Sequence, residues 1–230
     1  MIKLKDLINE ADKPLKILVP RRDASERLKN YIIAAQRQVQ NYIKNGMEGN
    51  LDLSYTPITS LPDNLIKVGG SLDLGSALVR KLPDNLKQID GALYLSYSEI
   101  ESLPDNLTIN GHLDVHSTKN LKKLPANLTI KDTLYISYTD AKELSDNLTV
   151  GHDLDLSGAH ITQLPKNLKV GGTLDISESE ITSLPKDLSV EGDLYVQGTP
   201  IGEKYTEKEL RKMLPKVKGD IFTDEDDFMY

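Results

Sequence analysis

The sequence contains no cysteine and no tryptophan, and only two of its 230 residues are phenylalanine. Without cysteine the chain can form no disulfide, no cysteine-ligated metal site and no thiol nucleophile, and this composition suits a reducing compartment or a virion. Aromatic residues make up 5% of the chain, against 38% for all hydrophobic residues. The interior must therefore be built from Leu, Ile and Val rather than from large rings.

Long apolar runs and a strongly basic surface are also missing. No stretch approaches 18 consecutive apolar residues, and no apolar segment opens the chain, so we expect neither a membrane partner nor a secretory signal. Residues 1–50 hold ten Lys/Arg against six Asp/Glu, a net charge of +4, and residues 201–230 hold six against eight, a net charge of −2. Since the whole chain has a net charge of −7, residues 51–200 carry −9. Because binding to a phosphate backbone depends on cationic side chains, this acidic body argues against a nucleic-acid partner.

A short motif recurs every 20 or 21 residues. It reads LPDNL at 61–65, 82–86 and 103–107, LPANL at 124–128, LSDNL at 144–148, LPKNL at 164–168 and LPKDL at 184–188. Before each copy two apolar residues alternate with a polar one, starting at Leu51 and Leu53, and an eighth such pair is Leu194 and Val196. This alternation predicts a short strand in every unit, and the Pro-containing return segment excludes a regular helix there.

Stacking of these units predicts an α/β repeat solenoid. Eight strands would form one parallel sheet, roughly 35 Å wide at a spacing of about 4.8 Å, over continuous columns of Leu, Ile and Val. The pattern over residues 51–201 resembles the leucine-rich repeat family, in its short bacterial class. The resemblance implies a concave parallel β-sheet, an irregular Pro-containing convex side, and a noncatalytic protein-binding module that uses the concave face.

The repeats depart from that family at one inward position. Where the family usually places Asn, this chain has small residues: Thr56, Ala77, Ser98, Thr118, Thr139, Ala159, Ser179 and Thr199. A different column of amides could satisfy the turns instead, because an amide both donates and accepts hydrogen bonds. Its members are Asn64, Asn85, Asn106, Asn127, Asn147 and Asn167.

A helix is predicted to cap the N-terminal end of the solenoid. Asp23 with Glu26 three residues later is typical of a helix start, and Gly46 of a helix end. Apolar residues from Leu28 to Ile43 fall on one face of this helix, which we expect to cover the first repeat.

A second, shorter helix is predicted at the other end, where Thr206 and Glu209 begin it and Pro215 ends it. We therefore divide the chain into four predicted segments: a cleavable targeting peptide (1–10), a linker with the capping helix (11–50), an eight-repeat solenoid (51–201), and a C-terminal cap with an acidic tail (202–230).

The candidate binding residues are those that point outward from the strands. They form a column of carboxylates interrupted by rings, to which one His at the next outward position is added: Asp52, Asp73, Tyr94, Asp114, Tyr135, Asp155, Asp175, Tyr195 and His116. Adjacent carboxylates cost stability unless solvent or a cation compensates. Two interpretations stay open, a solvated acidic face or a docking surface for a basic protein partner with Tyr as anchors.

No residues point to a metal, a cofactor or catalysis. His112, Asp114 and His116 alternate along one strand, but the outer imidazoles start about 13 Å apart, too far for one ion unless all three converge. Pairs of carboxylates arise in every repeat by stacking alone, so they do not identify an acid–base couple. We therefore predict that the protein is not an enzyme.

The first ten residues, MIKLKDLINE, resemble the head-targeting peptide on internal proteins of large contractile-tailed bacteriophages. In that group a protease cuts after Leu/Ile-x-Glu when a small residue follows, and here Glu10 precedes Ala11. The resemblance implies packaging in the virion interior, cleavage between these residues and delivery to the host cytoplasm. One alternative is that these residues form an N-terminal helix without a targeting function, in a protein of the bacterial cytoplasm. Another is that the protein is a structural spacer of a virion or cell surface.

Overall fold

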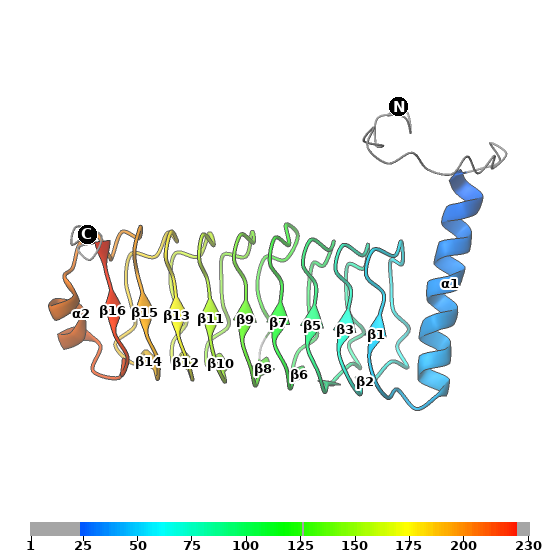
Figure 1. Ribbon diagram of the computed structural model, residues 1–230, viewed down its shortest axis with the longest axis horizontal. Coiled ribbons are helices and arrows are strands. Elements are labelled where there is room, and N and C mark those ends of the chain that lie inside the picture. The colour runs from blue at the N-terminus through cyan, green and yellow to red at the C-terminus, as the bar shows by residue number, and fades with distance from the viewer. Residues whose placement is uncertain (1–23, 126, 225–230) are drawn as a thin grey trace, which may run out of the picture.

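The protein is a row of stacked turns with one helix at each end (Figure 1). The computed structural model describes residues 24–125 and 127–224. The larger sheet has nine parallel strands in the order β1 (Leu51–Asp52), β3 (Leu72–Asp73), β5 (Leu93–Tyr94), β7 (Leu113–Asp114), β9 (Leu134–Tyr135), β11 (Leu154–Asp155), β13 (Leu174–Asp175), β15 (Leu194–Tyr195) and β16 (Ile221–Phe222). The predicted repeat solenoid with its parallel sheet is thus confirmed.

The interior consists of aliphatic columns that run the length of the array. Leu51, Leu72 and Leu93 are paired in register, and the same column continues through every repeat to Leu194 and Ile221. The largest fully buried side chains are all Leu or Ile. Burial of such side chains is worth about 1.5–3 kcal/mol each, so the shortage of large rings does not weaken the core.

The return segments contain a second parallel sheet, where the sequence predicted only irregular structure. Its seven strands are β2 (Lys67–Val68), β4 (Gln88–Ile89), β6 (Thr108–Ile109), β8 (Thr129–Ile130), β10 (Thr149–Val150), β12 (Lys169–Val170) and β14 (Ser189–Val190). Strands on both sides of the solenoid share the same spacing of about 4.8 Å, so neither side is longer than the other. The strands accordingly stand in an almost straight row, and the sheet face expected to be concave shows little curvature along the array (Figure 1).

Backbone hydrogen bonds close the buried turns after the strands of the larger sheet, as from the Ala77 N–H to the Leu74 carbonyl at 3.0 Å, and threonine hydroxyls add a second bond where threonine holds the inward position. Thr56 donates to the Leu53 carbonyl at 2.6 Å, and Thr118 donates to the Val115 carbonyl at 2.7 Å. The column of asparagines is exposed, and its amides form two bonds across neighbouring turns, from Asn127 to Asn106 at 3.1 Å and from Asn167 to Asn147 at 3.0 Å. The predicted role of these amides in closing the buried turns is therefore wrong, because they lie at the surface of the return segments.

Helix α1 (Ala24–Lys44) covers the first turn with its C-terminal half only. Ala35 and Val39 are buried, and the Gln38 amide donates to the Asp52 carbonyl at 2.6 Å, which occupies a hydrogen-bonding group at the edge of the sheet. Leu28 and Tyr31, expected on the buried face, are 49% and 67% exposed, because this half of the helix projects beyond the solenoid (Figure 1).

The C-terminal end is closed by helix α2 (Glu207–Met213) and by β16. Thr206 and Glu209 form the predicted capping box, in which each accepts a hydrogen bond from the backbone of the other. Arg211 joins the two elements, since its guanidinium donates to the Gly219 carbonyl at 2.8 Å and pairs with Asp220. Within the described part of the chain, neither helix has the length and apolar character needed to cross a bilayer.

Candidate functional site

Parallel pairing brings eight of the nine predicted outward residues into one straight row across the larger sheet, and His116 lies beside this row, two residues after Asp114. We call this set the outward row: Asp52, Asp73, Tyr94, Asp114, Tyr135, Asp155, Asp175, Tyr195 and Phe222. Phe222 was not predicted, because the ninth strand comes from the C-terminal cap and lies outside the repeat period. Its ring stacks on Tyr195 with centroids 4.5 Å apart.

Each carboxylate of the outward row also holds the turn that follows its strand. Asp155 accepts from the Ser157 backbone at 2.9 Å and from its hydroxyl at 2.6 Å, and Asp175 bonds Ser177 in the same way. The same two bonds from Ser54 lower the pKa of Asp52. The Asp-x-Ser pattern visible in the sequence is a signal for this turn. Part of the acidic column is therefore explained by local structure alone.

Three tyrosines occupy a backbone conformation that side chains normally avoid. The turn residue directly before each small inward residue need not be large, because its type varies from repeat to repeat. In chain order this turn position, always at φ between +54° and +65°, is held by Tyr55, Ser76, Tyr97, Ser117, Tyr138, Gly158, Glu178 and Gly198. A left-handed conformation costs a residue with a Cβ roughly 1–2 kcal/mol. Since two turns close with Gly, the fold does not require a ring here.

In all eight repeats this turn position comes directly before the small inward residue, as Tyr97 comes before Ser98. The three tyrosines project from it into solvent, with Tyr55, Tyr97 and Tyr138 exposed to 83%, 64% and 53%. The surface therefore carries large rings at turns whose backbone conformation disfavours any residue with a Cβ.

The rings of the third, fourth and fifth turns contact one another. We call this set the central ring cluster: Tyr94, Tyr97, His112, His116, Tyr135 and Tyr138. Each imidazole lies edge-on between two tyrosines, with centroids 4.9 and 6.0 Å away for His112, and 5.4 and 5.7 Å away for His116. His116 also lies 3.1 Å from the Ser137 hydroxyl. The sequence placed Tyr94, His112, His116 and Tyr135 on one face but could not show that they form one cluster with the two turn tyrosines.

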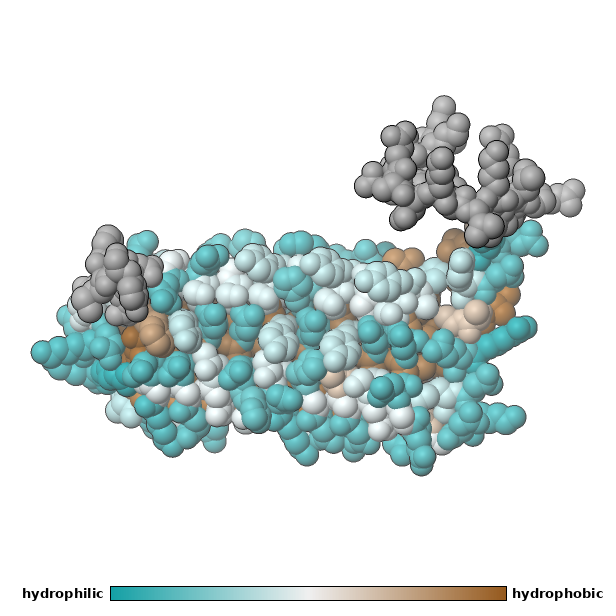
Figure 2. Space-filling view, viewed as in Figure 1, coloured by the Kyte–Doolittle hydropathy of each residue, from teal (hydrophilic) through white to brown (hydrophobic). Residues whose placement is uncertain are grey.

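The predicted carboxylate neighbours are confirmed as strand neighbours, since Asp52 pairs with Asp73 and Asp155 with Asp175. Such like-charged pairs are unfavourable at the surface of a sheet. Among the described residues no group of three or more His, Asp or Glu side chains is arranged to hold a metal ion. Figure 2 shows a largely hydrophilic molecule with apolar residues visible in a band along its middle.

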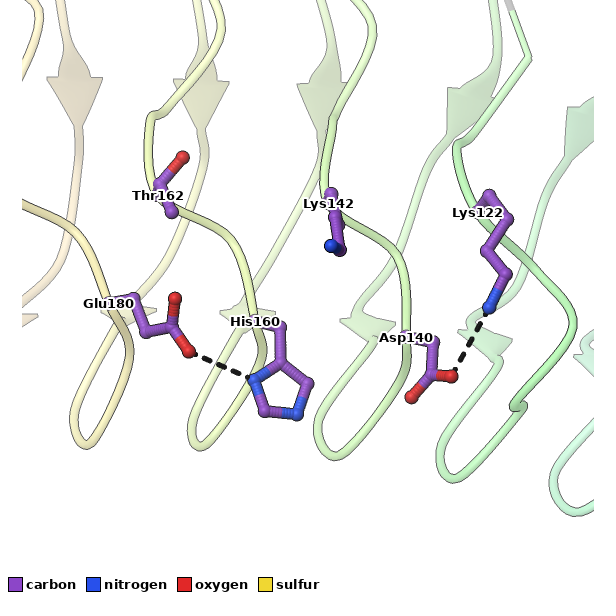
Figure 3. Close-up of a pocket in the computed structure, with 6 residues that line it drawn as sticks. All are labelled: Lys122, Asp140, Lys142, His160, Thr162 and Glu180. Atoms are coloured by element: carbon purple, nitrogen blue, oxygen red, sulfur yellow. Dashed lines mark hydrogen bonds and ion pairs between the residues drawn. The ribbon is translucent and has the colours of Figure 1, made fainter.

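A second candidate surface is an open hollow of about 610 Å³ beside the turns of the fourth to seventh repeats (Figure 3). It is lined by Lys122, Asp140, Lys142, His160, Thr162 and Glu180. The Lys122 amine lies 3.2 Å from the Asp140 carboxylate and lowers the pKa of that group, and His160 lies 3.1 Å from Glu180. Exposed ion pairs of this kind contribute little free energy, and they link neighbouring turns.

The predicted processing residues Glu10 and Ala11 lie outside the described residues, as do positions 12–23 of the predicted linker and 225–230 of the acidic tail.

The stacked aliphatic columns, the parallel sheet and the outward row define a leucine-rich-repeat-like solenoid. Among solved structures, the chain is similar to YopM, described as a leucine-rich effector protein from Yersinia pestis, at 17% identity and a TM-score of 0.35. The match covers 76% of this chain and 70% of that one. No protein-family model matches the chain, and no curated protein gives a significant match.

Proposed function

We propose that this protein is a noncatalytic protein-binding module whose binding surface is the outer face of the nine-stranded sheet. The observation that carries the proposal is the exposure of Tyr97 and Tyr138 at left-handed turn positions where Gly158 and Gly198 serve equally well. Rings that the fold does not need, and that project into solvent, suit the aromatic anchors on which protein interfaces depend. The carboxylates between them favour a partner with cationic side chains.

A display experiment tests this proposal without knowledge of the natural partner. Short random peptides would be selected for binding to the full chain, and their affinities would then be measured for two double variants. We expect Tyr94→Ser/Tyr135→Ser to abolish binding of most selected peptides. The matched control, Thr129→Ser/Thr149→Ser, changes outward positions of the seven-stranded sheet and should leave binding intact. The opposite pattern would move the binding surface to the other sheet.

The second part of the proposal is packaging in a bacteriophage head followed by delivery to the host cytoplasm. It rests on the sequence MIKLKDLINE before Ala11, which resembles a head-targeting peptide. Mass spectrometry of purified virions tests it, because the packaged protein should be present and should begin at Ala11. A protein that is absent, or that begins at Met1, would contradict packaging.

A structural spacer remains the alternative function, and the covered ends of the solenoid argue against it. Helix α1 lies over the first turn, and helix α2 lies against β16, so the described part of the chain offers no bare repeat for end-to-end stacking. Copy number in the virion separates the two functions, since a spacer should occur in symmetry-related copies.

A further inference from the structure

The fourth turn differs from every other turn in what surrounds its carboxylate. Asp114 pairs in register with Tyr94 on one side and Tyr135 on the other. Within the described outward row it is the one carboxylate with a ring on both sides. His112 and His116 lie two residues before and after it, on the same side of the strand, because the residues between them are buried.

Asp114 accepts one hydrogen bond in its turn, whereas each carboxylate of the three Asp-x-Ser turns accepts two. One of its oxygens accepts from the His116 backbone N–H at 2.9 Å. The hydroxyl that supplies a second bond to Asp155 is missing here, because His116 stands where Ser157 stands in that turn. Its other oxygen accepts no hydrogen bond from the described residues. A ring-framed carboxylate therefore retains capacity for an external donor.

From this arrangement we infer that Asp114 and the four rings around it bind an arginine side chain of the protein partner. The inference rests on the proposed function and specifies the partner's chemistry. A guanidinium is planar, always charged and weakly hydrated, so it can stack on an aromatic face while it donates to a carboxylate. Neither Asp155 nor Asp175 offers rings on both sides, so an arginine there would remain solvated.

NMR titration with a small probe tests the site directly. N-acetyl-arginine amide would be added to the full chain at low ionic strength and fixed pH, and the ring signals of Tyr94, His112, His116 and Tyr135 would be followed. We expect these signals to shift and to saturate. The control probe is N-acetyl-citrulline amide, which has the same shape without the charge and should cause no saturable shift.

Matched variants separate a specific site from a diffuse acidic field. Asp114→Asn keeps an oxygen that can accept from the His116 N–H, so the turn should survive. We expect it to weaken arginine binding about tenfold, which corresponds to about 1.4 kcal/mol. Asp175→Asn removes one charge from the same row and should leave the affinity unchanged. A second variant, Tyr94→Leu/Tyr135→Leu, should weaken binding while Asp114 stays in place.

Four results would overturn the inference. They are the absence of a saturable shift, an equal shift with the citrulline probe, an equal loss in Asp114→Asn and Asp175→Asn, and tighter binding of N-acetyl-trimethyllysine amide than of the arginine probe. None of these bears on the proposed binding face, which is judged separately by the selected peptides and by Tyr94→Ser/Tyr135→Ser. Failure of the arginine site alone would leave a sheet that binds its partner by other contacts.

Discussion

The central turns, with strands β5, β7 and β9, and the later turns, with β11, β13 and β15, share one backbone and differ in their surface. Both sets have the same paired strands, the same buried aliphatic columns and the same left-handed turn position. The central turns present the central ring cluster, whereas the later ones present Asp155 and Asp175, two glycines at the left-handed position and, at the last turn, Tyr195 stacked on Phe222. This contrast teaches that the interior sets the fold while the outward positions vary independently of it.

The largest predicted effect is a loss of stability on truncating a buried leucine, and it should be equal in the two regions. Leu95 and Leu156 occupy equivalent positions, and each is completely buried. Replacing either one by Ala should cost about 2–5 kcal/mol in the free energy of unfolding, because each change leaves a cavity in the same column. Urea unfolding monitored by circular dichroism measures the loss. A loss confined to one region would contradict the view that both interiors are equivalent.

Substitutions at the left-handed turn position should change the free energy of unfolding differently in the two regions. Gly158→Ala adds a Cβ at φ +59° and places it 2.9 Å from a ring atom of Tyr138, so we expect a loss of about 1–2 kcal/mol. Tyr97→Gly relieves the same backbone strain in the central region, at the expense of greater freedom in the unfolded chain. Its free energy of unfolding should therefore stay within about 1 kcal/mol of the wild type.

Thermal and urea unfolding of both variants check this prediction, with Ser76→Gly as the control for a turn outside the central ring cluster. A loss of more than about 2 kcal/mol in the free energy of unfolding of Tyr97→Gly would exceed what an aromatic contact contributes. Such a loss would show that the fold depends on the ring.

The acidic pairs should produce a smaller difference. Asp175→Asn keeps its turn bond to Ser177 and removes the repulsion from Asp155, so it should raise the free energy of unfolding by about 0.2–1 kcal/mol at low salt. Asp114→Asn has tyrosines on both sides and should gain nothing from that source. Salt should abolish the gain of Asp175→Asn, because charges at the surface are screened. Equal effects at all salt concentrations would contradict the assignment.

The smallest expected effect concerns acid and the turn serines. The two hydrogen bonds from Ser54 lower the folded-state pKa of Asp52, so they stabilise the protein above the unfolded pKa of about 3.9. This contribution is lost as the pH falls through the lower folded value. Ser54→Ala should therefore destabilise the protein slightly near neutral pH and not at all below that value. A loss that is the same at both pH values would exclude the linkage.

Much of the fold could be predicted because the sequence repeats every 20 or 21 residues, with apolar and polar residues alternating at the start of each repeat. The alternation at Leu51 and Leu53 recurs in every repeat, so the register of the outward row followed from the repeat length. The second sheet was missed because its strands carry no alternation of apolar and polar residues to detect, as at Lys67 and Val68, where one apolar residue is followed by two glycines. The extent of α1 was predicted, but not that Leu28 projects beyond the first turn, because that depends on how the helix meets the solenoid.

The candidate site was predicted in part for the same reason. The residues of the outward row followed from the repeat, whereas the contacts of His112 and His116 with tyrosines depend on side-chain directions that the sequence does not specify. The Asp-x-Ser pattern is a signal in the sequence for the turns that follow β1 and β11. Packaging and cleavage at Glu10 stay predictions.

The affinity of the selected peptides for Tyr97→Gly/Tyr138→Gly tests the central claim most directly, measured beside the free energy of unfolding of the same variant. If the rings serve binding and not folding, the affinity should fall at least about tenfold, or about 1.4 kcal/mol, while the protein stays as stable as the wild type to within about 2 kcal/mol. Unchanged affinity in a stably folded variant would contradict the claim.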